Sequence, residues 1–543
     1  MDLNLRLSLK IKPRIANKPA NKPEEKFNRR NDNQKFNQTS SNMLKTHTRN
    51  IPLIRRLARF NSTIARDPVT IIPTVYELTE AKDLTPETNP DNSLLEYLQS
   101  RHLIESITDD NLYKLTKRGS NHKFKLYCGA DPTASSLHLG NLLPLMVLLH
   151  FKMSGNDVVG LVGGATGLVG DPSGRKTERN KINEVEVEDN VTKIQRQIST
   201  FLSNGIEYAK SRQFPMTEKV GDTTSVNNAS WWENVKMLEF LATYGRHIRV
   251  SSMLARDSIQ SRLELGGIGF NEFTYQILQA YDFWHLYKDE NVNMQVGGND
   301  QWGNITAGID LISRLRKFHD KKHEAYGLTV PLLTTSSGEK FGKSAGNAVF
   351  IDSNLTTPYQ MYQYFINVPD DIVGKLLKVF TLLPLNVIEG ELLPKHNSDP
   401  GLRIAQRVLA REVVDLIHGV GVGDEMAFIT GFLFPTPDQP FNDNVSADKL
   451  IENFKRSGIL FKRDKPSPDE EIKLSALLAD IVGKSKGEMR RLIKAGGVYM
   501  GLDRNQIEDP DDVILFDVEN HLIDGKLLLV RVGKQNYYVV EFV

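Results

Sequence analysis

One segment limits the fold of this chain more than any other: an apolar strand, a polar loop and an apolar helix follow one another from Phe124. The letters FKLYCG at 124–129 predict a short buried strand, DPTASS at 131–136 a loop, and LHLGNLLPLMVLLHF from 137 a helix. Strand, loop and helix in this order make half of a mononucleotide-binding unit. A helix N-terminus attracts anions, because its free N–H groups and its dipole point there. We therefore predict an α/β fold with an anion site near His138 and Gly140, one turn into the helix.

A glycine-rich run follows. Residues 158–174 read VVGLVGGATGLVGDPSG, which begins as a strand and becomes a turn. Glycine lets the backbone approach a ligand closely, so four glycines are candidates to cradle a phosphate, although tight turns also use glycine: Gly163, Gly164, Gly167 and Gly170. Asp171 ends the run, and Arg175, Lys176 and Arg179 come next. A carboxylate beside cations suits a zwitterionic ligand.

A third segment places polar side chains on one face of a helix. EFTYQILQAYDFWHLY at 272–287 has a helical period, and Tyr275, Gln279 and Asp282 are spaced so that they share one face. A tyrosine, an amide and a carboxylate together are unusual in a core. The face therefore either binds a polar ligand or contacts solvent.

Two further segments carry polar groups after predicted strands or glycines. QVGGNDQWGN at 295–304 predicts a strand followed by Asp300 and Gln301. Ligands of open α/β sheets bind beyond the carboxyl ends of strands, so Asp300 suits the hydroxyl pair of a ribose, or else it caps a helix. Lys340 and Lys343 lie in the loop SSGEKFGKSAGN, where two lysines can neutralise a triphosphate or simply face solvent.

The first 66 residues differ from the rest in charge. They carry 16 Lys and Arg but only 4 Asp and Glu, whereas the remaining residues are net acidic. From Met43 to Arg66 there is no acidic residue, and apolar residues recur at helical spacing with arginines on the other side. This pattern is typical of an organellar presequence, and a basic arm that binds nucleic acid is the alternative. Residues 1–42, rich in Asn, Lys and Pro, predict disorder.

Composition excludes some classes of protein and site. No apolar run approaches the ~20 residues of a membrane-spanning helix, so we expect no membrane span. Cys128 is the one cysteine, which excludes an intramolecular disulfide and a zinc site built from cysteines.

The order of the motifs resembles the class I aminoacyl-tRNA synthetases. HLGN at 138–141 is similar to the HIGH motif of that family, and KFGKS at 340–344 to its KMSKS motif. YCGADPTASSLHLGN, GGATGLVGDPSG, YQILQAYD and GGNDQWGNITAG resemble more narrowly the tyrosyl-specific enzymes of bacteria and organelles. Asn141 replaces the last histidine of HIGH, and Phe341-Gly342 replaces Met-Ser, but both lysines remain.

The resemblance covers residues 91–543 and implies several domains. A Rossmann-like, parallel-sheet α/β catalytic domain would span 91–352, an α-helical anticodon-side domain 353–440, and a linker with an S4-like α+β RNA-binding domain 441–543. Residues 1–66 would hold a disordered tail and a mitochondrial presequence, and 67–90 a linker. RNA phosphates would meet a basic cluster in the last domain: Lys484, Lys486, Arg490, Arg491 and Lys494.

The resemblance also implies roles for the site residues, with ATP as a substrate and Mg²⁺ held by its phosphates rather than by protein ligands. L-Tyrosine would be bound by Tyr127, Asp171, Tyr275, Gln279, Asp282 and Gln301. ATP would be bound by Cys128, Gly129, Asp131, His138, Gly140, Gly298, Asp300, Lys340, Phe341, Gly342, Lys343 and Ser344. The residues expected to act in the reaction are Thr133, His138, Asn141, Arg175, Arg179, Lys340 and Lys343.

Under this resemblance the chain attaches tyrosine to tRNA(Tyr) through a tyrosyl-adenylate, as a homodimer in the mitochondrial matrix. Three alternatives stay open. They are a tryptophan enzyme of the same class, a non-catalytic RNA-binding factor, and a second role as a group I intron splicing factor that uses the N-terminal tail or the loop at 211–226. Pyrophosphate exchange with tyrosine and with tryptophan separates the first of these from the prediction.

Overall fold

The computed structural model describes residues 92–174, 183–264, 266–318, 323–334, 343–344, 347–434, 446–465, 472–502, 504–511, 513–514, 522–533 and 536–543. The chain divides after Asp67 into two units, and all described residues belong to the second, Pro68–Val543. Some predictions lie outside the described residues: the presequence, and the roles of Arg175, Arg179, Lys340, Phe341 and Gly342. At Lys343 and Ser344 only the backbone is described.

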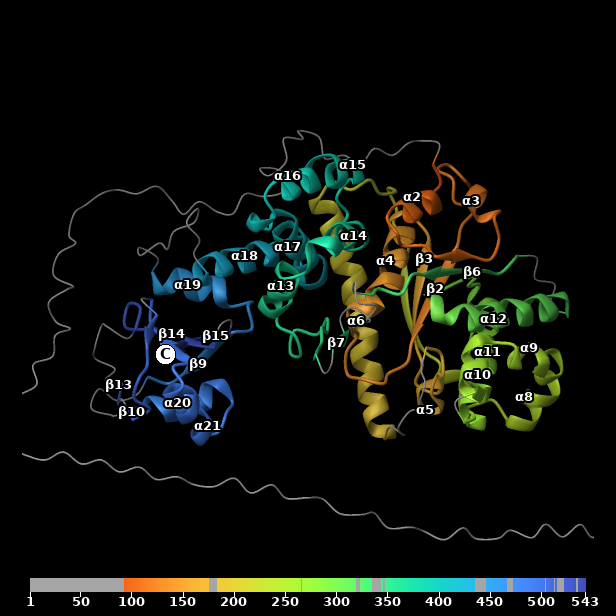
Figure 1. Cartoon of the computed structure of the whole chain (residues 1–543). Coiled ribbons are helices and arrows are strands. Elements are labelled where there is room, and N and C mark those ends of the chain that lie inside the picture. The colour runs from red at the N-terminus through yellow and green to blue at the C-terminus, as the bar shows by residue number, and fades with distance from the viewer. Residues whose placement is uncertain are drawn as a thin grey trace, which may run out of the picture. The chain divides into compact units, whose positions relative to one another are not determined.

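A six-stranded sheet confirms the predicted α/β fold (Figure 1). Its order is β1-β6-β5-β2-β3-β4, and every neighbouring pair is parallel except β1 with β6. The bounds are β1 Ser106–Ile107, β2 Lys125–Ala130, β3 Asp157–Val162, β4 Thr223–Asn227, β5 Met294–Gly298 and β6 Tyr326–Val330. The chain runs from β2 through β3 to β4 on one side, then returns to β5 and β6 on the other. Such a reversal of strand order opens a crevice beyond the carboxyl ends of the strands, here of β2 and β5.

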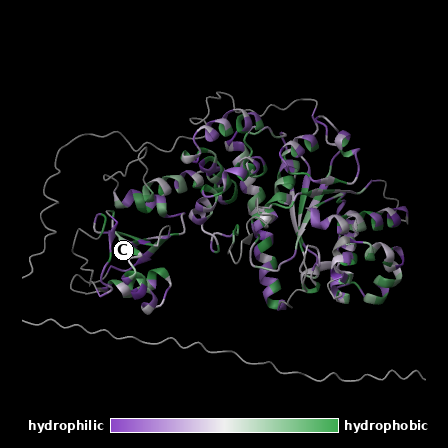
Figure 2. Cartoon of the chain, viewed as in Figure 1, coloured by the Kyte–Doolittle hydropathy of each residue, from purple (hydrophilic) through white to green (hydrophobic). Residues whose placement is uncertain are grey.

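Helices cover both faces of this sheet. On one face lie α4 (Leu139–Met153) and α6 (Glu184–Ser211), and on the other α11 (Phe270–Glu290) and α12 (Trp302–Leu315) (Figure 1). Helix α4 is apolar around most of its circumference, and twelve of its fifteen residues are buried, as expected for a helix enclosed in a core. Along helix α6, hydrophobic residues recur at helical spacing among hydrophilic ones (Figure 2). One face of the helix therefore packs on the core and the other faces solvent.

Shorter elements complete the N-terminal part. Their bounds are α2 Leu94–Ser100, α3 Leu112–Leu115, α5 Thr166–Val169, α7 Ala229–Trp232, α8 Met237–Thr243, α9 Val250–Leu254, α10 Asp257–Glu264, β7 Lys343–Ser344 and β8 Asn347–Ala348. Helix α2 begins with a capping box, in which Ser93 accepts the N–H of Glu96 and the Glu96 carboxylate accepts that of Ser93. This reciprocal pair satisfies two backbone donors that the first turn leaves open.

A helical region follows the sheet, as the sequence predicted. Its elements are α13 Pro358–Ile366, α14 Asp370–Phe380, α15 Leu385–Val387, α16 Leu393–Ser398, α17 Ile404–His418 and α18 Val422–Leu433. Helix α13 begins at a second capping box, formed by Thr357 and Gln360. None of the helices in the described part of the chain is long and apolar enough to cross a bilayer.

The last part of the chain mixes helices and strands around a core of its own. A five-stranded sheet has the order β12-β11-β14-β15-β9, with β15 and β9 parallel. Elements in this part are α19 Ala447–Phe454, β9 Leu460–Arg463, β10 Ile472–Lys473, α20 Leu474–Val482, α21 Lys486–Lys494, β11 Val498–Met500, β12 Asn505–Gln506, β13 Val513–Ile514, β14 Leu527–Val532 and β15 Asn536–Phe542. Leu478, Met489 and Leu528 are among the residues of this core.

A buried ionic contact joins α6 to α17. Arg212 follows α6 and donates to Glu412 at 3.0 and 3.1 Å and to Asp415 at 2.8 Å. Both carboxylates are only 2% exposed, and the Tyr208 hydroxyl donates to Glu412 at 2.6 Å. Burial raises the pKa of Asp415 to about 6, while Arg212 acts in the opposite direction. Two buried anions therefore depend on one guanidinium.

We expect Arg212→Met to lower the free energy of unfolding by about 3–5 kcal/mol, because it leaves buried carboxylates without their cation. Urea-induced unfolding, followed by circular dichroism, measures the loss. Lys210→Met is the matched control, because Lys210 lies two residues before Arg212 and forms an exposed ion pair with Glu207. Its loss should change the free energy of unfolding by less than about 0.5 kcal/mol. Equal effects of the two substitutions would contradict this account.

Candidate active site

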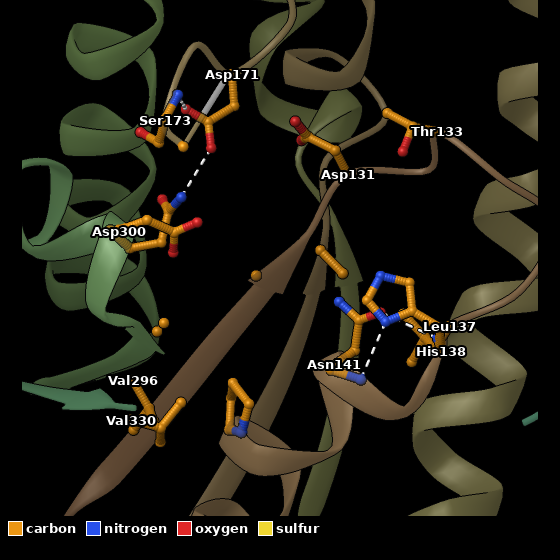
Figure 3. A pocket seen from close by; sticks show the side chains of 18 of the residues that line it. Asp131, Thr133, Leu137, His138, Asn141, Asp171, Ser173, Val296, Asp300 and Val330 are labelled. Atoms are coloured by element: carbon orange, nitrogen blue, oxygen red, sulfur yellow. Dashed lines mark hydrogen bonds between the residues drawn. The ribbon is translucent and has the colours of Figure 1, made fainter. Parts of the chain in front are cut away.

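A cavity of about 760 Å³ lies at the crevice beyond β2 and β5. Its walls come from the loop after β2, the start of α4, the segment after β3, helix α11 and the end of β5. Figure 3 shows Asp171 and Asp300 on one side, Thr133 and His138 on the other, and Asp131 between them. The predicted site residues that line it are Tyr127, Gly129, Asp131, Thr133, His138, Gly140, Asn141, Asp171, Tyr275, Gln279, Asp282, Gly298, Asp300 and Gln301.

His138 is the N-cap of α4 and does not lie one turn into the helix, which corrects the sequence interpretation. Its backbone N–H donates to Asn141 Oδ1 at 3.0 Å, and its Nδ1 accepts the N–H of Gly140 at 3.0 Å (Figure 3). Since Nδ1 accepts, the neutral ring carries its proton on Nε2. A Cβ at Gly140 would lie 2.9 Å from Cε1 of the ring, so glycine leaves room for the imidazole. Asn141 thus helps to fix the direction in which His138 donates.

Asp282 is a buried carboxylate held by three side-chain donors. Trp231 Nε1 and Trp232 Nε1 donate to its Oδ1 at 2.8 and 2.7 Å, and Asn228 Nδ2 donates to its Oδ2 at 3.0 Å. Asp282 is only 2% exposed. Burial raises the pKa of Asp282 to about 7, because the loss of hydration outweighs the three hydrogen bonds that favour the charged form.

Tyr127 contributes a phenol that lacks a partner. The residue is 1% exposed, and its hydroxyl oxygen is buried without a hydrogen bond to any described residue. Burial, and next the nearby Asp282 carboxylate, raise the pKa of this phenol well above its usual value, so it stays protonated and can donate. A buried hydroxyl without a partner costs free energy unless a ligand supplies one.

A network of amides orients the polar wall of the cavity. Asp171 accepts the N–H of Ser173 at 2.9 Å and the Nε2 of Gln301 at 2.8 Å. Asn304 Nδ2 lies 2.9 Å from Gln279 Oε1 and 3.0 Å from Gln301 Oε1. Tyr275, Gln279 and Asp282 all line the cavity, so the alternative of a solvated helix face is wrong. The face that the helical period predicted is the face that meets the cavity.

Asp131 is positioned by two hydroxyls. The Tyr275 hydroxyl donates to its Oδ2 at 2.8 Å, and the Thr166 hydroxyl donates to its Oδ1 at 3.0 Å. A Cβ at Gly163 would lie 2.3 Å from both Asp131 Oδ1 and Thr166 Oγ1. Glycine at 163 therefore serves this internal contact. The prediction that the glycine cluster cradles a phosphate is wrong for this site, since none of its four glycines lines the cavity.

The described lining is acidic. Four carboxylates contribute to it (Asp131, Asp171, Asp282 and Asp300), and it contains no lysine or arginine. Such a wall attracts an ammonium group, whereas phosphates need cations. No group of three His, Cys, Asp or Glu that could hold a metal occurs within the described ranges.

The predicted cations lie on segments that adjoin the lining in sequence. Arg175 and Arg179 follow Gly174, which lines the cavity, and residues 334–347 connect two further lining residues, Leu333 and Ala348. The side chains of Lys340 and Lys343 belong to that second segment and are outside the described side chains. Their roles stay predictions.

Several residues differ from the sequence-based set. Cys128 is buried in the hydrophobic core and is not among the residues that line the cavity. Sequence reasoning also missed Asn228, Trp231, Trp232 and Asn304. The letters NNASWW at 227–232 directly after a strand were the available signal, since polar and indole donors at a strand end can reach a ligand site.

Comparisons with known proteins agree with this geometry. The family model of the tRNA synthetases class I (W and Y) matches residues 119–430. The mitochondrial tyrosine–tRNA ligase of Saccharomyces cerevisiae is 45% identical over 507 residues, which cover 93% of this chain and 99% of that protein. The mitochondrial tyrosine–tRNA ligase of Drosophila melanogaster is 38% identical over 477 residues, 83% of this chain and 98% of that protein.

A solved structure is similar as well. The crystal structure of a C-terminally truncated Aspergillus nidulans mitochondrial tyrosyl-tRNA synthetase has a TM-score of 0.57 and 35% identity. The match covers 63% of this chain and 94% of the Aspergillus nidulans chain.

We expect Tyr127→Phe to raise the stability of the ligand-free protein by about 1 kcal/mol, because the substitution removes a buried hydroxyl that has no partner. Tyr208→Phe should have the opposite effect, since the Tyr208 hydroxyl donates to buried Glu412. Thermal unfolding of both variants measures the difference. A loss of stability in Tyr127→Phe as large as that in Tyr208→Phe would show that the Tyr127 hydroxyl is already satisfied.

Proposed function

This chain belongs to the class I tRNA synthetases (W and Y), as a tyrosyl-tRNA synthetase of the mitochondrial type, and we propose that its cavity binds tyrosine beside β2 and α11 and ATP beside the start of α4. The chain attaches tyrosine to tRNA. The relatives are named as ligases alone, so neither a second role in intron splicing nor a purely RNA-binding role is proposed.

The observation that carries the tyrosine site is the pairing of Tyr127 with Asp282. Tyr127 is a buried donor without a partner among the described residues, and Asp282 is a buried acceptor in the same cavity. A phenol hydroxyl can accept from Tyr127 and donate to Asp282, whereas an indole N–H only donates. This pair therefore favours tyrosine over tryptophan. Asp171, Tyr275 and Gln279 would hold the substrate ammonium, with Gln301 beside its carboxylate.

The ATP site is proposed at the other lining residues. Asp300 and Gly298 would meet the ribose, and the Nε2–H of His138 and the hydroxyl of Thr133 would donate to phosphate oxygens. Mg²⁺ would be bound through those phosphates, which supply the oxygen ligands it prefers and help to disperse their charge. Cations from the segments that hold Arg175, Arg179, Lys340 and Lys343 would balance the acidic wall.

The reaction needs positioning more than a protein nucleophile. A carboxylate oxygen of tyrosine attacks the α-phosphorus of ATP, the bond to the bridging oxygen breaks, and pyrophosphate leaves. A hydroxyl of the terminal adenosine of the tRNA then attacks the carbonyl carbon of the adenylate, and AMP leaves. Donors fixed toward the phosphates before the reaction stabilise charge that develops in the transition state. The capped orientation of His138 supports that role.

We further propose that the last part of the chain is an S4-like RNA-binding domain. Its α+β arrangement and the exposed basic residues of α21 support this. Lys484 pairs with Glu488 and Arg490 with Asp511. The cations best placed for RNA are therefore Lys486, Arg491 and Lys494, which are exposed.

A homodimer in the mitochondrial matrix completes the proposal. Helices α8 and α9 expose large apolar side chains, among them Leu238 at 81% and Val250 at 59% exposure, and exposed apolar groups of this kind mark protein interfaces. A solution mass equal to one chain would contradict the dimer. The names of the relatives and the basic, acid-poor residues 43–66 support the location. Failure of a tagged full-length chain to enter mitochondria would contradict it.

Tyrosine-dependent exchange between pyrophosphate and ATP tests the central proposal. The full chain should catalyse exchange with tyrosine and not with tryptophan. The kcat/KM for tyrosine should fall as the pH drops through about 7, because protonation of Asp282 removes the acceptor of the phenol proton. Asp282→Ala should reduce kcat/KM by at least about tenfold, since a hydrogen bond to a charged group is lost. Exchange with tryptophan alone would overturn the assignment.

The RNA-binding role has a separate test. Replacing Lys486, Arg491 and Lys494 together by glutamate should weaken tRNA binding at least tenfold, because each lost phosphate contact removes a favourable electrostatic term. The exchange reaction, which needs no tRNA, should be unchanged. The matched control replaces the paired cations Lys484 and Arg490 by glutamine and should have the smaller effect. Normal aminoacylation by the triple variant would contradict the role.

A further inference from the structure

The two indoles on Asp282 meet the same oxygen atom. Trp231 Nε1 and Trp232 Nε1 both donate to Oδ1, while Asn228 is the one donor to Oδ2 among the described residues. All three donors come from one short stretch, because α7 (Ala229–Trp232) directly follows β4. The two carboxylate oxygens are therefore not equivalent before any substrate binds.

The number of acceptor sites on the Asp282 carboxylate limits where a substrate can donate to it. A carboxylate oxygen accepts about two hydrogen bonds in its plane, so the carboxylate offers about four sites in all. The two indoles occupy those of Oδ1, and Asn228 leaves one at Oδ2. A substrate hydroxyl that donates to Asp282 therefore has to donate to Oδ2.

Packing holds Trp232 in the orientation that this requires. Its ring contacts Tyr281 at a centroid distance of 4.8 Å and Phe240 at 5.4 Å. Trp231 instead stacks on His285 at 4.4 Å. Each indole thus has its own aromatic support, and removing the N–H of Trp232 by substitution with phenylalanine leaves an aromatic ring in the same place.

We propose that Trp232 is a positioning residue for substrate specificity: it fills the second acceptor site of Asp282 Oδ1, so that only Oδ2 receives the hydroxyl of tyrosine. The inference rests on the proposed tyrosine site and adds a residue to it. Without the Trp232 donor, Oδ1 can take a water molecule or a proton, and the carboxylate loses its fixed orientation.

The groups around Asp282 determine its pKa, so a change in one of them can be measured through the pH dependence of the reaction. Burial raises the pKa of Asp282, the donors from Asn228, Trp231 and Trp232 lower it, and the Asp131 carboxylate, just after β2, raises it further. Other titratable groups that face this region are Tyr127 from β2, Asp171 after β3, and Tyr275, Tyr281 and His285 from α11. Burial lowers the pKa of His285, so this ring adds little positive charge near neutral pH. Loss of one donor should therefore raise the pKa of Asp282.

The test is Trp232→Phe in the full chain, with pyrophosphate exchange measured against pH for tyrosine and for phenylalanine. One donor to a charged acceptor is worth about 1.5–3 kcal/mol, and one pKa unit corresponds to about 1.4 kcal/mol. The acid limb of kcat/KM for tyrosine should then move up by about one to two pH units. At pH 7.5 the preference for tyrosine over phenylalanine should fall about tenfold, because phenylalanine has no hydroxyl to place.

Trp284→Phe is the matched control. It makes the same chemical change two residues from Asp282, on a fully buried side chain that is not one of the three described donors to Asp282. It should lower the unfolding temperature without moving the acid limb. If wild type activates tyrosine but Trp232→Phe keeps both the acid limb and the preference for tyrosine, the positioning role is overturned. If wild type does not activate tyrosine, the proposed function fails instead.

Discussion

The parallel pairing of β2 with two neighbours is the interaction on which the rest of this structure depends. Cys128 lies opposite both Gly160 of β3 and Val296 of β5, so β2 is paired along both of its edges and lies inside the sheet. Its carboxyl end faces the point where the strand order reverses. The start of α4, the loop with Asp131 and the polar end of β5 all reach one cavity because they leave the sheet at this edge.

Burying a carboxylate is costly, and the chain offsets that cost in two different ways. Arg212 pairs with both Glu412 and Asp415, which are not among the residues that line the cavity. Among the described residues Asp282 instead receives neutral donors, two indoles and an amide, so no cation offsets its burial and its pKa stays raised, at about 7. Tyr127 beside it keeps an unsatisfied hydroxyl. These two buried groups lower the stability of the ligand-free protein, and they are also the groups that can bind a substrate hydroxyl.

Much of the site could be predicted from local patterns. The spacing of Tyr275, Gln279 and Asp282 gives a shared helix face whatever the helix packs against, and the strand before Asp300 fixes the edge at which it emerges. The position of His138 could not be obtained in this way. His138 caps the helix because its Nδ1 accepts the Gly140 N–H and its own backbone N–H donates to Asn141 Oδ1. The spacing of apolar residues does not predict such hydrogen bonds.

The sequence by itself determined the class of fold, the order of the motifs and the residue types at the cavity, because these follow from short-range periodicity and from chemistry encoded residue by residue. Only the tertiary structure decided the partners of those residues. Asn228, Trp231 and Trp232 reach Asp282 across 50 to 54 positions of sequence. Cys128 lies in the core, although its neighbours Tyr127 and Gly129 line the cavity. Successive side chains of a strand point to opposite faces, and contacts between distant segments arise only when sheet and helices close on one another.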